Sequence, residues 1–195
     1  MQKQQKNQIQ NPIFAAYERV CGINSPIHPT VIFGKNVRLG ENVVIDEHSV
    51  IGNNVFIGHN TVIRNNVCIG SHSTIGHSVV IEGGVDIGAY STIQSLCFVA
   101  SHAIIGDHVF MAPKSMILNT KKICHGRNYK VDLLKTRIQS WARISAGAIC
   151  MPGISVGRNA QLAAGSVATR DIPDKEIWTG TPAVYFKSVP EDEIV

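Results

Sequence analysis

Residues 51–75 read IGNNVFIGHNTVIRNNVCIGSHSTI, and in this stretch an isoleucine returns at every sixth position. The spacing extends in both directions, and the positions that follow it are Ile27, Phe33, Leu39, Ile45, Ile51, Ile57, Ile63, Ile69, Ile75, Ile81, Ile87, Ile93, Val99, Ile105, Met111 and Ile117. An amphipathic helix has a period of about 3.6 and an alternating strand a period of about 2, so neither fits. A six-residue repeat is typical of a parallel β-helix.

Each six-residue unit is interpreted as a short strand followed by a corner. The aliphatic side chain would point into the core, and the small or β-branched residue four positions later, such as Val55 or Ser73, would fill the corner. Asn, His and Gly dominate three positions after the aliphatic residue, as at Asn54 and His72, and these types tolerate a positive φ. Full burial of each large side chain contributes about 1.5 to 3 kcal/mol. The pattern predicts an all-β fold, because a β-sandwich would not keep a fixed six-residue phase.

Length and composition fit a single domain with an aliphatic core. The chain has 195 residues, of which 44% are hydrophobic and only 6% aromatic. Its net charge of +4 is scattered, which suits a phosphate-bearing ligand and does not indicate nucleic-acid binding. No apolar run is long enough to span a membrane, and residues 1–10 lack the apolar region of a signal peptide. We therefore expect a cytoplasmic protein whose five cysteines, which form no CxxC pair, stay reduced.

The repeat is interrupted in three places that lie close together in the sequence. Gln94 stands where earlier repeats have glycine, and the Ser-His pair at 101–102 occupies a corner. After Ile117 the repeat resumes only at Ile138, although the next aliphatic residue is due at the sixth position. The extra residues, about 118–132, must leave the β-helix as a loop, and a loop of this length in a regular scaffold is usually functional.

The loop is basic and rich in hydrogen-bonding groups. His102 precedes Thr120 by three repeats, so we expect it one coil below the root of the loop. Places where a local pattern fails are candidates for function. The side chains that the loop brings to this candidate site are Asn119, Lys121, Lys122, His125 and Arg127.

Glycine directly follows the aliphatic residue at Gly34, Gly40, Gly52, Gly58, Gly70, Gly76, Gly88 and Gly106. With this feature the chain resembles the hexapeptide-repeat acyltransferase superfamily over about residues 27–182. The resemblance implies a left-handed parallel β-helix with three repeats per turn, and a homotrimer whose active site lies in the groove between subunits, under the loop. Residues 1–26 would then cap the open first coil, with a short helix over about 11–20, and residues 183–195 would form a tail.

The last repeats are similar to the C-terminal part of sugar acetyltransferases. The sequence RISAGA at 143–148 and the sequences MPGISVG, LAAGSV and TRDIP after it carry this likeness. In that family the region lines the channel for coenzyme A, so the resemblance implies acetyl-CoA as co-substrate and no metal. The residues that it implies for cofactor binding are Ser145, Ala146, Ala164, Arg170 and Gly180.

Residues 93–119 resemble the N-acetyltransferases that act on nucleotide-linked 3-amino sugars in the synthesis of surface polysaccharides. The matching positions are Ile93, Gln94, Val109, Phe110, Pro113 and Asn119. The likeness implies that the acetyl group goes to an amino group of a nucleotide-linked sugar. Sugar O-acetylation is an alternative, because positions that match galactoside and maltose acetyltransferases are Ile105, Gly106, Asp107, Ala112 and Pro113.

Acetyl transfer needs a nucleophile on the acceptor, and a base where that nucleophile carries a proton. Histidine is the side chain best suited to accept a proton at neutral pH, and His125 is the first candidate for this base and His102 the second. An amine delivered unprotonated needs no base, and Asn119 and Gln94 would then orient the acceptor or the thioester. The loop cations that would bind a nucleotide diphosphate are Lys121, Lys122 and Arg127.

Two other functions stay open from the sequence. The γ-class carbonic anhydrases share this scaffold and hold zinc with three histidines; His72 and His77 have the five-residue spacing of such a site, but Asn36 stands where the third ligand is expected. A non-catalytic β-helix scaffold is the other alternative, against which the loop and the coenzyme-like C-terminal repeats argue. Corner histidines in place of asparagine explain the same pattern, and the spacing predicts two stacked columns, His59 with His77, and His72 with Tyr90 and His108.

Overall fold

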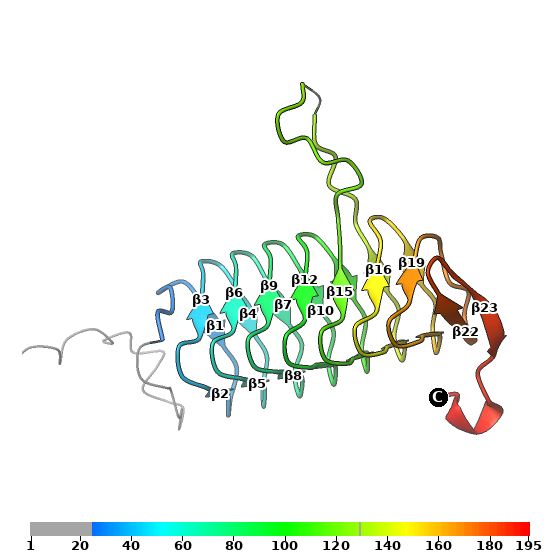
Figure 1. The fold of residues 1–195 in the computed structure, drawn as a ribbon. Helices are drawn as coiled ribbons and strands as arrows, with labels where there is room; N and C mark the ends of the chain where they lie inside the picture. The colour runs from blue at the N-terminus through cyan, green and yellow to red at the C-terminus, as the bar shows by residue number, and fades with distance from the viewer. Residues whose placement is uncertain (1–24, 129) are drawn as a thin grey trace, which may run out of the picture.

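Three β-sheets, parallel except for the last pair of strands, form the faces of a triangular prism built from stacked coils (Figure 1). The computed structural model describes residues 25–128 and 130–195. Each coil takes three repeats, since Ile32 pairs with Val50 and Phe33 with Ile51. The left-handed parallel β-helix expected from the repeat is confirmed. The helix expected near residues 11–20 lies outside the described residues.

Each face consists mainly of two-residue strands. Sheet A contains β3 (Val44–Ile45), β6 (Val62–Ile63), β9 (Val80–Ile81), β12 (Phe98–Val99), β15 (Met116–Ile117), β18 (Ile149–Cys150) and β21 (Val167–Ala168). Sheet B contains β1 (Ile32–Phe33), β4 (Val50–Ile51), β7 (Cys68–Ile69), β10 (Asp86–Ile87), β13 (Ile104–Ile105), β16 (Arg137–Ile138) and β19 (Ser155–Val156). Sheet C contains β2 (Arg38–Leu39), β5 (Phe56–Ile57), β8 (Thr74–Ile75), β11 (Thr92–Ile93), β14 (Phe110–Met111), β17 (Arg143–Ile144), β20 (Gln161–Leu162), β22 (Glu176–Gly180) and β23 (Ala183–Ser188). We call the corners edge AB, edge BC and edge CA, after the two sheets that the chain joins there.

The second residue of each two-residue strand points into the prism and is buried. Ile63, Ile75 and Ile93 have no exposed surface, as the six-residue phase predicts. Small residues fill the inner side of the corners, and their hydroxyl groups are satisfied there. The Ser73 Oγ donates to the Gly88 carbonyl at 2.9 Å and accepts the Ser91 N–H at 3.1 Å. The core therefore carries polar atoms without leaving them unpaired.

The third residue of most four-residue corners has a positive φ, which confirms the interpretation of Asn, His and Gly at this position. The φ angle is 56° at Asn54, 63° at His72 and 70° at Gly84. Stacked corner side chains also bond to one another, and the Asn36 Nδ2 donates to the Asn54 Oδ1 at 3.0 Å. The corners thus turn the chain with residue types that adopt the left-handed region at low cost.

Glycine at the first position of a corner marks a close approach between successive coils. A Cβ built on Gly70 would lie 2.4 Å from the Ala89 nitrogen, a backbone atom that cannot move aside. Any side chain at this position would push the two coils apart.

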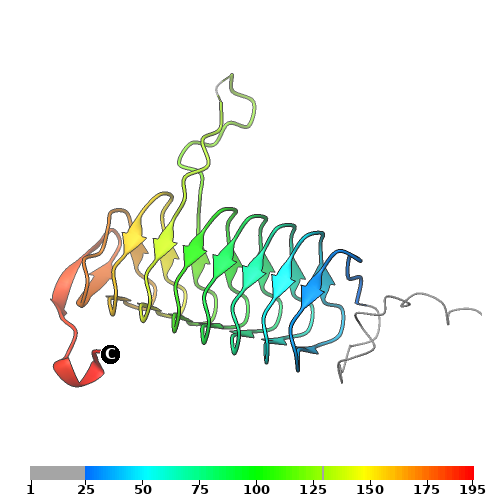
Figure 2. The same ribbon diagram turned by 180° about the vertical axis from the view of Figure 1, so that it is seen from behind.

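The hairpin of β22 and β23 covers the C-terminal end of the prism (Figure 2). Strand β22 pairs in parallel with β20, and β23 turns back antiparallel to it. Trp178 on β22 pairs in register with Leu162 and is only 8% exposed, so its indole extends the core past the last full coil. No helix among the residues that are described is long and apolar enough to cross a membrane.

After β23 the chain returns over sheet C through a short 3-10 turn, η2 (Glu191–Glu193). The Arg143 guanidinium forms an ion pair with Glu193. The Asn159 side chain exchanges two bonds with the backbone of Val195, at 3.0 and 3.2 Å. The tail is therefore held against the prism by specific contacts.

Candidate functional site

One long loop leaves the prism at edge AB, between β15 and β16, and stands away from the coils (Figure 1). Strand β16 then takes up the register of sheet B again, because Arg137 pairs with Ile104 just as Ile104 pairs with Asp86 in the coil before. The structure thus has its extra residues between β15 and β16, where the break in the repeat predicts them. The coils before and after the loop stack as if the loop were not there.

The loop is closed at its base by a short neck. Thr120 pairs with Leu133 in an antiparallel bridge, and the Leu134 N–H donates to the Asn119 carbonyl at 2.7 Å. Below the neck, the buried Thr136 Oγ1 donates to the Leu118 carbonyl at 2.9 Å. The neck fixes where the loop starts, because its backbone groups pair with each other.

Asn119 and the corner of Ser101 and His102 are brought together, as their spacing of three repeats predicts. The Asn119 Nδ2 donates to the Ser101 carbonyl at 3.3 Å, and its Oδ1 accepts the Thr120 hydroxyl at 3.0 Å. His102 is exposed, and a Cβ built on Gly84 would lie 2.6 Å from its Nδ1, so the imidazole extends over that glycine. The imidazole thus points toward the coil before it, whereas Asn119 lies in the coil after it and reaches the same corner through the Ser101 backbone. An exposed imidazole can accept a proton from a bound acceptor.

The loop cations and His125 are exposed to solvent, above the prism. The Arg127 N–H donates to the Cys124 carbonyl at 2.8 Å, and its Nη1 donates to the His125 carbonyl at 3.0 Å. These bonds shape a turn that holds the His125 backbone. Within the described residues, no hydrogen bond or ion pair links the His125 side chain to the coils. The loop thus offers His125 as a separate group, at a distance from His102.

Edge CA carries only small residues in the last coils. Ala146 and Ala164 stack there on successive coils, each followed by a glycine, and all four residues are exposed. A Cβ built on Gly147 or Gly165 would have nothing within 4 Å. We call residues 145–147 and 163–165 together the bare edge. Its open surface lets an extended ligand lie directly on the backbone.

The bare edge also interrupts a ladder of bonds between coils. In the first coils, the Glu41 N–H donates to the His59 Nδ1 and the His59 N–H to the His77 Nδ1, both at 2.9 Å. The His77 N–H donates to the Ser95 Oγ at 3.1 Å. The next residues of this column, Pro113, Ala146 and Ala164, have no side-chain acceptor. In the part of the chain described here, the N–H groups of Ser95, Ala146 and Ala164 therefore donate to no protein atom.

Two other residues proposed for the cofactor, Ser145 and Gly180, lie in or beside this edge. The Gln161 Nε2 donates to the Ser145 Oγ at 3.3 Å, and the Gly180 N–H donates to the Ser166 Oγ at 2.9 Å. Arg170 lies elsewhere, at edge AB of the last coil, where its guanidinium carbon is 5.3 Å from the ring centroid of Trp178. This contact gives Arg170 a packing role at the end of the core that the sequence did not indicate.

Gln94 lies at edge CA, as the bare edge does, whereas His102 lies at edge AB, on the other side of sheet A. The strand β12 runs between them. An extended segment of about six residues at about 3.3 Å per residue separates the two edges, which makes roughly 15 to 20 Å. One chain therefore does not bring the predicted acceptor-binding amide and the predicted base together, although both lie at the same level of the prism.

Positive charge gathers in the second half of the prism. Residues 110–180 contain eleven Lys or Arg and four Asp or Glu, whereas residues 25–109 contain three and six. The bare edge and the loop both lie in the basic half. An anionic ligand is favoured there by the field of the whole surface.

The outer face of sheet A is apolar along its whole length, a feature that our reading of the sequence missed. The first residue of each strand points outward, and in sheet A all of these residues are apolar: Val44, Val62, Val80, Phe98, Met116, Ile149 and Val167. The sequence shows this pattern: in every third repeat, the residue directly before the buried core residue is apolar. A continuous apolar face of this kind is typical of an interaction site.

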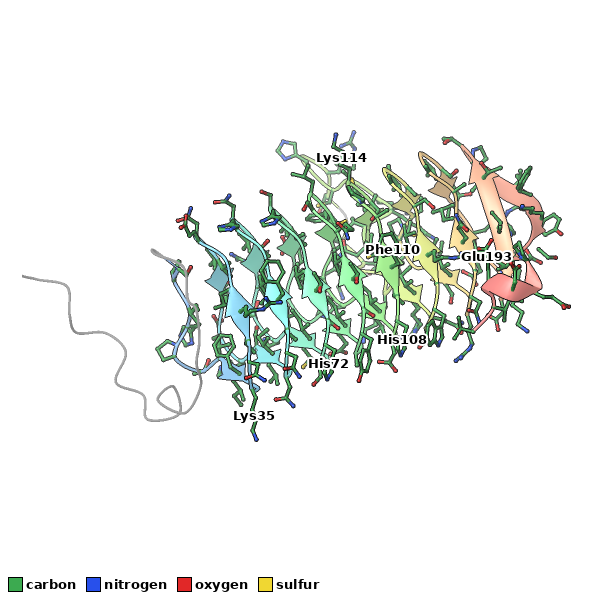
Figure 3. The ribbon with its side chains drawn as sticks, turned by 90° about the horizontal axis from the view of Figure 1, so that it is seen from below. Lys35, His72, His108, Phe110, Lys114 and Glu193 are labelled. Carbon is green, nitrogen blue, oxygen red and sulfur yellow. The ribbon has the colours of Figure 1, made fainter. Side chains whose placement is uncertain are left out.

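The corner histidines form stacks. The ring centroids of His59 and His77 lie 5.2 Å apart, and His72, Tyr90 and His108 follow one another at 4.8 and 4.9 Å. Both predicted columns are confirmed. Figure 3 shows His72 and His108 projecting along edge BC and Lys114 on the far edge of the same sheet. No three His, Cys, Asp or Glu side chains within residues 25–128 and 130–195 converge as metal ligands.

The buried cysteines do not belong to the site. Burial raises the pKa of the Cys150 thiol to about 12, and burial also raises the pKa of Cys97. A thiol with a raised pKa holds little thiolate near neutral pH and is a poor nucleophile. Cys150 and Cys97 therefore serve as small core residues.

Two family models match the sequence. The model described as GMPPB C-terminal domain matches residues 22–132, more than half of the chain, and the model described as hexapeptide repeat of succinyl-transferase matches residues 144–170. Galactoside O-acetyltransferase of Lactococcus lactis subsp. lactis is 28% identical over 96 residues, which are 49% of this chain and 45% of that protein. Gamma carbonic anhydrase 2, mitochondrial, of Arabidopsis thaliana is 30% identical over 94 residues, 47% of this chain and 28% of that one. The chain spans about half the length, or less, of the curated relatives it matches.

Solved structures share the fold. The polySia specific acetyltransferase NeuO has a TM-score of 0.64 at 18% identity, with 92% of this chain and 87% of that one covered. The hexapeptide-repeat containing acetyltransferase VCA0836 of Vibrio cholerae O1 biovar eltor, complexed with acetyl coenzyme A, has a TM-score of 0.58 at 21% identity, covering 63% and 71%. These similarities establish the architecture.

Proposed function

Because the chain belongs to the hexapeptide-repeat acetyltransferase family, we propose that it moves an acetyl group from acetyl-CoA to an amino group of a nucleotide-linked sugar. The observation that carries this proposal is the bare edge, where two successive coils offer exposed backbone in the basic half of the prism. A structural neighbour described as complexed with acetyl coenzyme A supports the choice of co-substrate. We place the reaction in the cytoplasm, where coenzyme A thioesters are used.

The pantetheine arm of acetyl-CoA suits the bare edge because it is long, thin and carries amide groups. The N–H groups of Ala146 and Ala164, which have no acceptor in the described chain, would bond to its carbonyls. Ser145 and Gly180 would border it. Because Arg170 lies at edge AB, it would meet the nucleotide phosphates of a cofactor on edge CA of an adjoining copy, by leaving or sharing its contact with Trp178.

We propose a homotrimer, because the two halves of the site lie on opposite edges of sheet A. An apolar face between two half-sites is suited to contact with another copy, which would set its edge AB against the edge CA of the first. Such a contact joins two different surfaces, and with a rotation of one third of a turn between copies it closes into a ring of three. An axis parallel to the prism would keep His102 and Asn119 level with the coils of edge CA.

The chemistry then needs little from the chain. The amine attacks the thioester carbonyl, a C–N bond forms, the C–S bond breaks, and coenzyme A leaves as a thiol. His125 or His102 would take the proton from the amine, a step worth about 10² to 10⁴ in rate. Asn119 and Gln94 would orient the acceptor or the thioester. The residues that would hold the nucleotide diphosphate are Lys121, Lys122 and Arg127.

Transfer to a sugar hydroxyl is the second candidate, favoured by the likeness to a galactoside O-acetyltransferase. A hydroxyl is a weaker nucleophile than an amine and needs a base to remove its proton. Loss of both histidines would then remove nearly all activity, whereas an amine acceptor could react without them. The two candidates therefore differ in how strongly they depend on His125 and His102.

Thiol release from acetyl-CoA tests the proposal, with matched panels of nucleotide-linked amino sugars and of sugars that carry only hydroxyl groups. We expect release with an amino sugar, and a product heavier by one acetyl group on nitrogen. His125→Asn and His102→Asn, alone and together, then identify the base. Absence of release with every acceptor would contradict acetyl transfer; zinc in the purified protein together with CO2 hydration would favour the carbonic anhydrase alternative.

A further inference from the structure

The third corner position on edge CA changes character along the prism. From the first coil to the last it is occupied by Asn42, Asn60, Ser78, Leu96, Lys114, Gly147 and Gly165. All seven residues have a positive φ. The two glycines belong to the bare edge, and the two positions just before them carry the largest side chains of the column. The open surface therefore ends at Lys114, with Leu96 behind it.

Leu96 is an unexpected residue for this position. Its φ is 65° and its surface is 51% exposed, so a large apolar side chain is held in solvent on a backbone conformation that suits asparagine. Asn60 and Asn42 show that the same column accepts asparagine two and three coils before Leu96. The fold alone does not need a leucine here.

Leu96 and Lys114 lie in the same coils of the prism as the predicted catalytic residues. Strand β12 runs from the corner of Leu96 to the corner of His102, and β15 runs from the corner of Lys114 to Asn119. Successive coils are about 4.8 Å apart. With the nucleotide of the cofactor at the basic C-terminal end, the acyl group of a thioester on the bare edge points toward Lys114 and then Leu96.

We propose that Lys114 and Leu96 form a stop that limits the length of the acyl chain. This inference rests on the proposed function and narrows its donor to short acyl thioesters. An acetyl group fits before Lys114, whereas a chain of six carbons meets the stem of Lys114 and the side chain of Leu96. In confined sites one extra methylene changes kcat/KM by about 10- to 200-fold.

The ratio of kcat/KM for hexanoyl-CoA to that for acetyl-CoA tests the stop. We expect a ratio below about 0.01 for the natural chain. Lys114→Gly extends the glycine column by one coil, and Leu96→Asn supplies the residue that the column uses elsewhere. In the double variant the ratio should rise at least tenfold, because two obstacles are gone. Ser78→Gly, one coil beyond Leu96 in the same column, is the control and should leave the ratio unchanged.

Stability is measured on the same variants. Leu96→Asn should keep or raise the melting temperature, since asparagine takes a positive φ more easily than leucine. A ratio in the double variant within twofold of the natural value would overturn the stop, as would an equal rise in Ser78→Gly. A natural chain that uses hexanoyl-CoA as well as acetyl-CoA would overturn it too. If the natural chain releases thiol from no thioester at all, the proposed function itself fails.

Discussion

The ring centroids of His108 and Trp141 lie 3.9 Å apart, and their planes differ by only 2°. The loop is inserted between these two residues in the sequence. Their contact is closer than those of His72 with Tyr90, at 4.8 Å, and of Tyr90 with His108, at 4.9 Å. The tightest contact of this column therefore joins the two coils between which the chain leaves the prism.

Replacing Trp141 by asparagine should lower the free energy of unfolding by about 1 to 3 kcal/mol, because the ring contact is lost while the positive φ stays favourable. Urea unfolding followed by circular dichroism measures the change. His48→Asn is the matched control, an exposed corner histidine with a φ of 59°, and should stay within about 0.5 kcal/mol. Equal losses in both variants would show that the stack adds nothing.

Excising the loop should separate stability from activity. Residues 121–132 can be replaced by Asn-Gly, which forms a two-residue turn between Thr120 and Leu133, already paired across the neck. The melting temperature should change by no more than a few degrees, since the excised residues are almost all exposed. We expect kcat/KM to fall at least 100-fold, because His125 and four cations are removed. Full activity in this variant would exclude the loop from the site.

A charge on the outer face of sheet A should break the assembly. Phe98→Glu and Met116→Glu place a carboxylate within the apolar column, where a partner copy would have to bury it. Sedimentation velocity should show a trimer for the natural chain and a monomer for each variant, with loss of activity. Phe110→Glu, on the outer face of sheet C, is the control and should stay trimeric. An unchanged sedimentation coefficient in both sheet A variants would place the subunit contact elsewhere.

Cys150 should make the protein less stable in alkaline solution. Its pKa is about 12 in the folded chain against 9.0 for an unperturbed thiol. Below pH 9 the thiol is protonated in both states, and its contribution to stability is complete. Between pH 9 and 12 the unfolded chain ionises first, so the free energy of unfolding falls by about 1.4 kcal/mol per pH unit for this group. Urea unfolding at pH 8, 9 and 10 should show a shallower decline in Cys150→Ala, and an identical decline would contradict the assignment.

The periodic part of the fold could be predicted from the sequence, because a six-residue step leaves its mark in every repeat. Burial of Ile63 or Ile93, the positive φ of Asn54 and the stacking of His59 on His77 all follow from position within the repeat. The insertion could be found for the same reason, as a break in phase.

The other features depend on contacts between segments that share no period. The covering of the core by Trp178 and the packing of Arg170 on it arise where the repeat ends. The ion pair of Arg143 with Glu193 joins residues 50 apart, one on a strand of the repeat and the other in the tail, which has no repeat. The candidate site shows the same division: spacing placed His102 one coil below Thr120, whereas the side-chain bonds of Asn119 with Ser101 and Thr120 appear only in the structure.

The closed neck of the loop makes edge AB a natural attachment point. Because Thr120 and Leu133 pair with each other and β16 resumes the register of sheet B unaided, the coils do not depend on what the loop contains. A foreign peptide whose two ends lie as close together as Thr120 and Leu133 could be displayed there, and the coils would stay unchanged. The same arrangement would let natural variants exchange their specificity loops while keeping one common core.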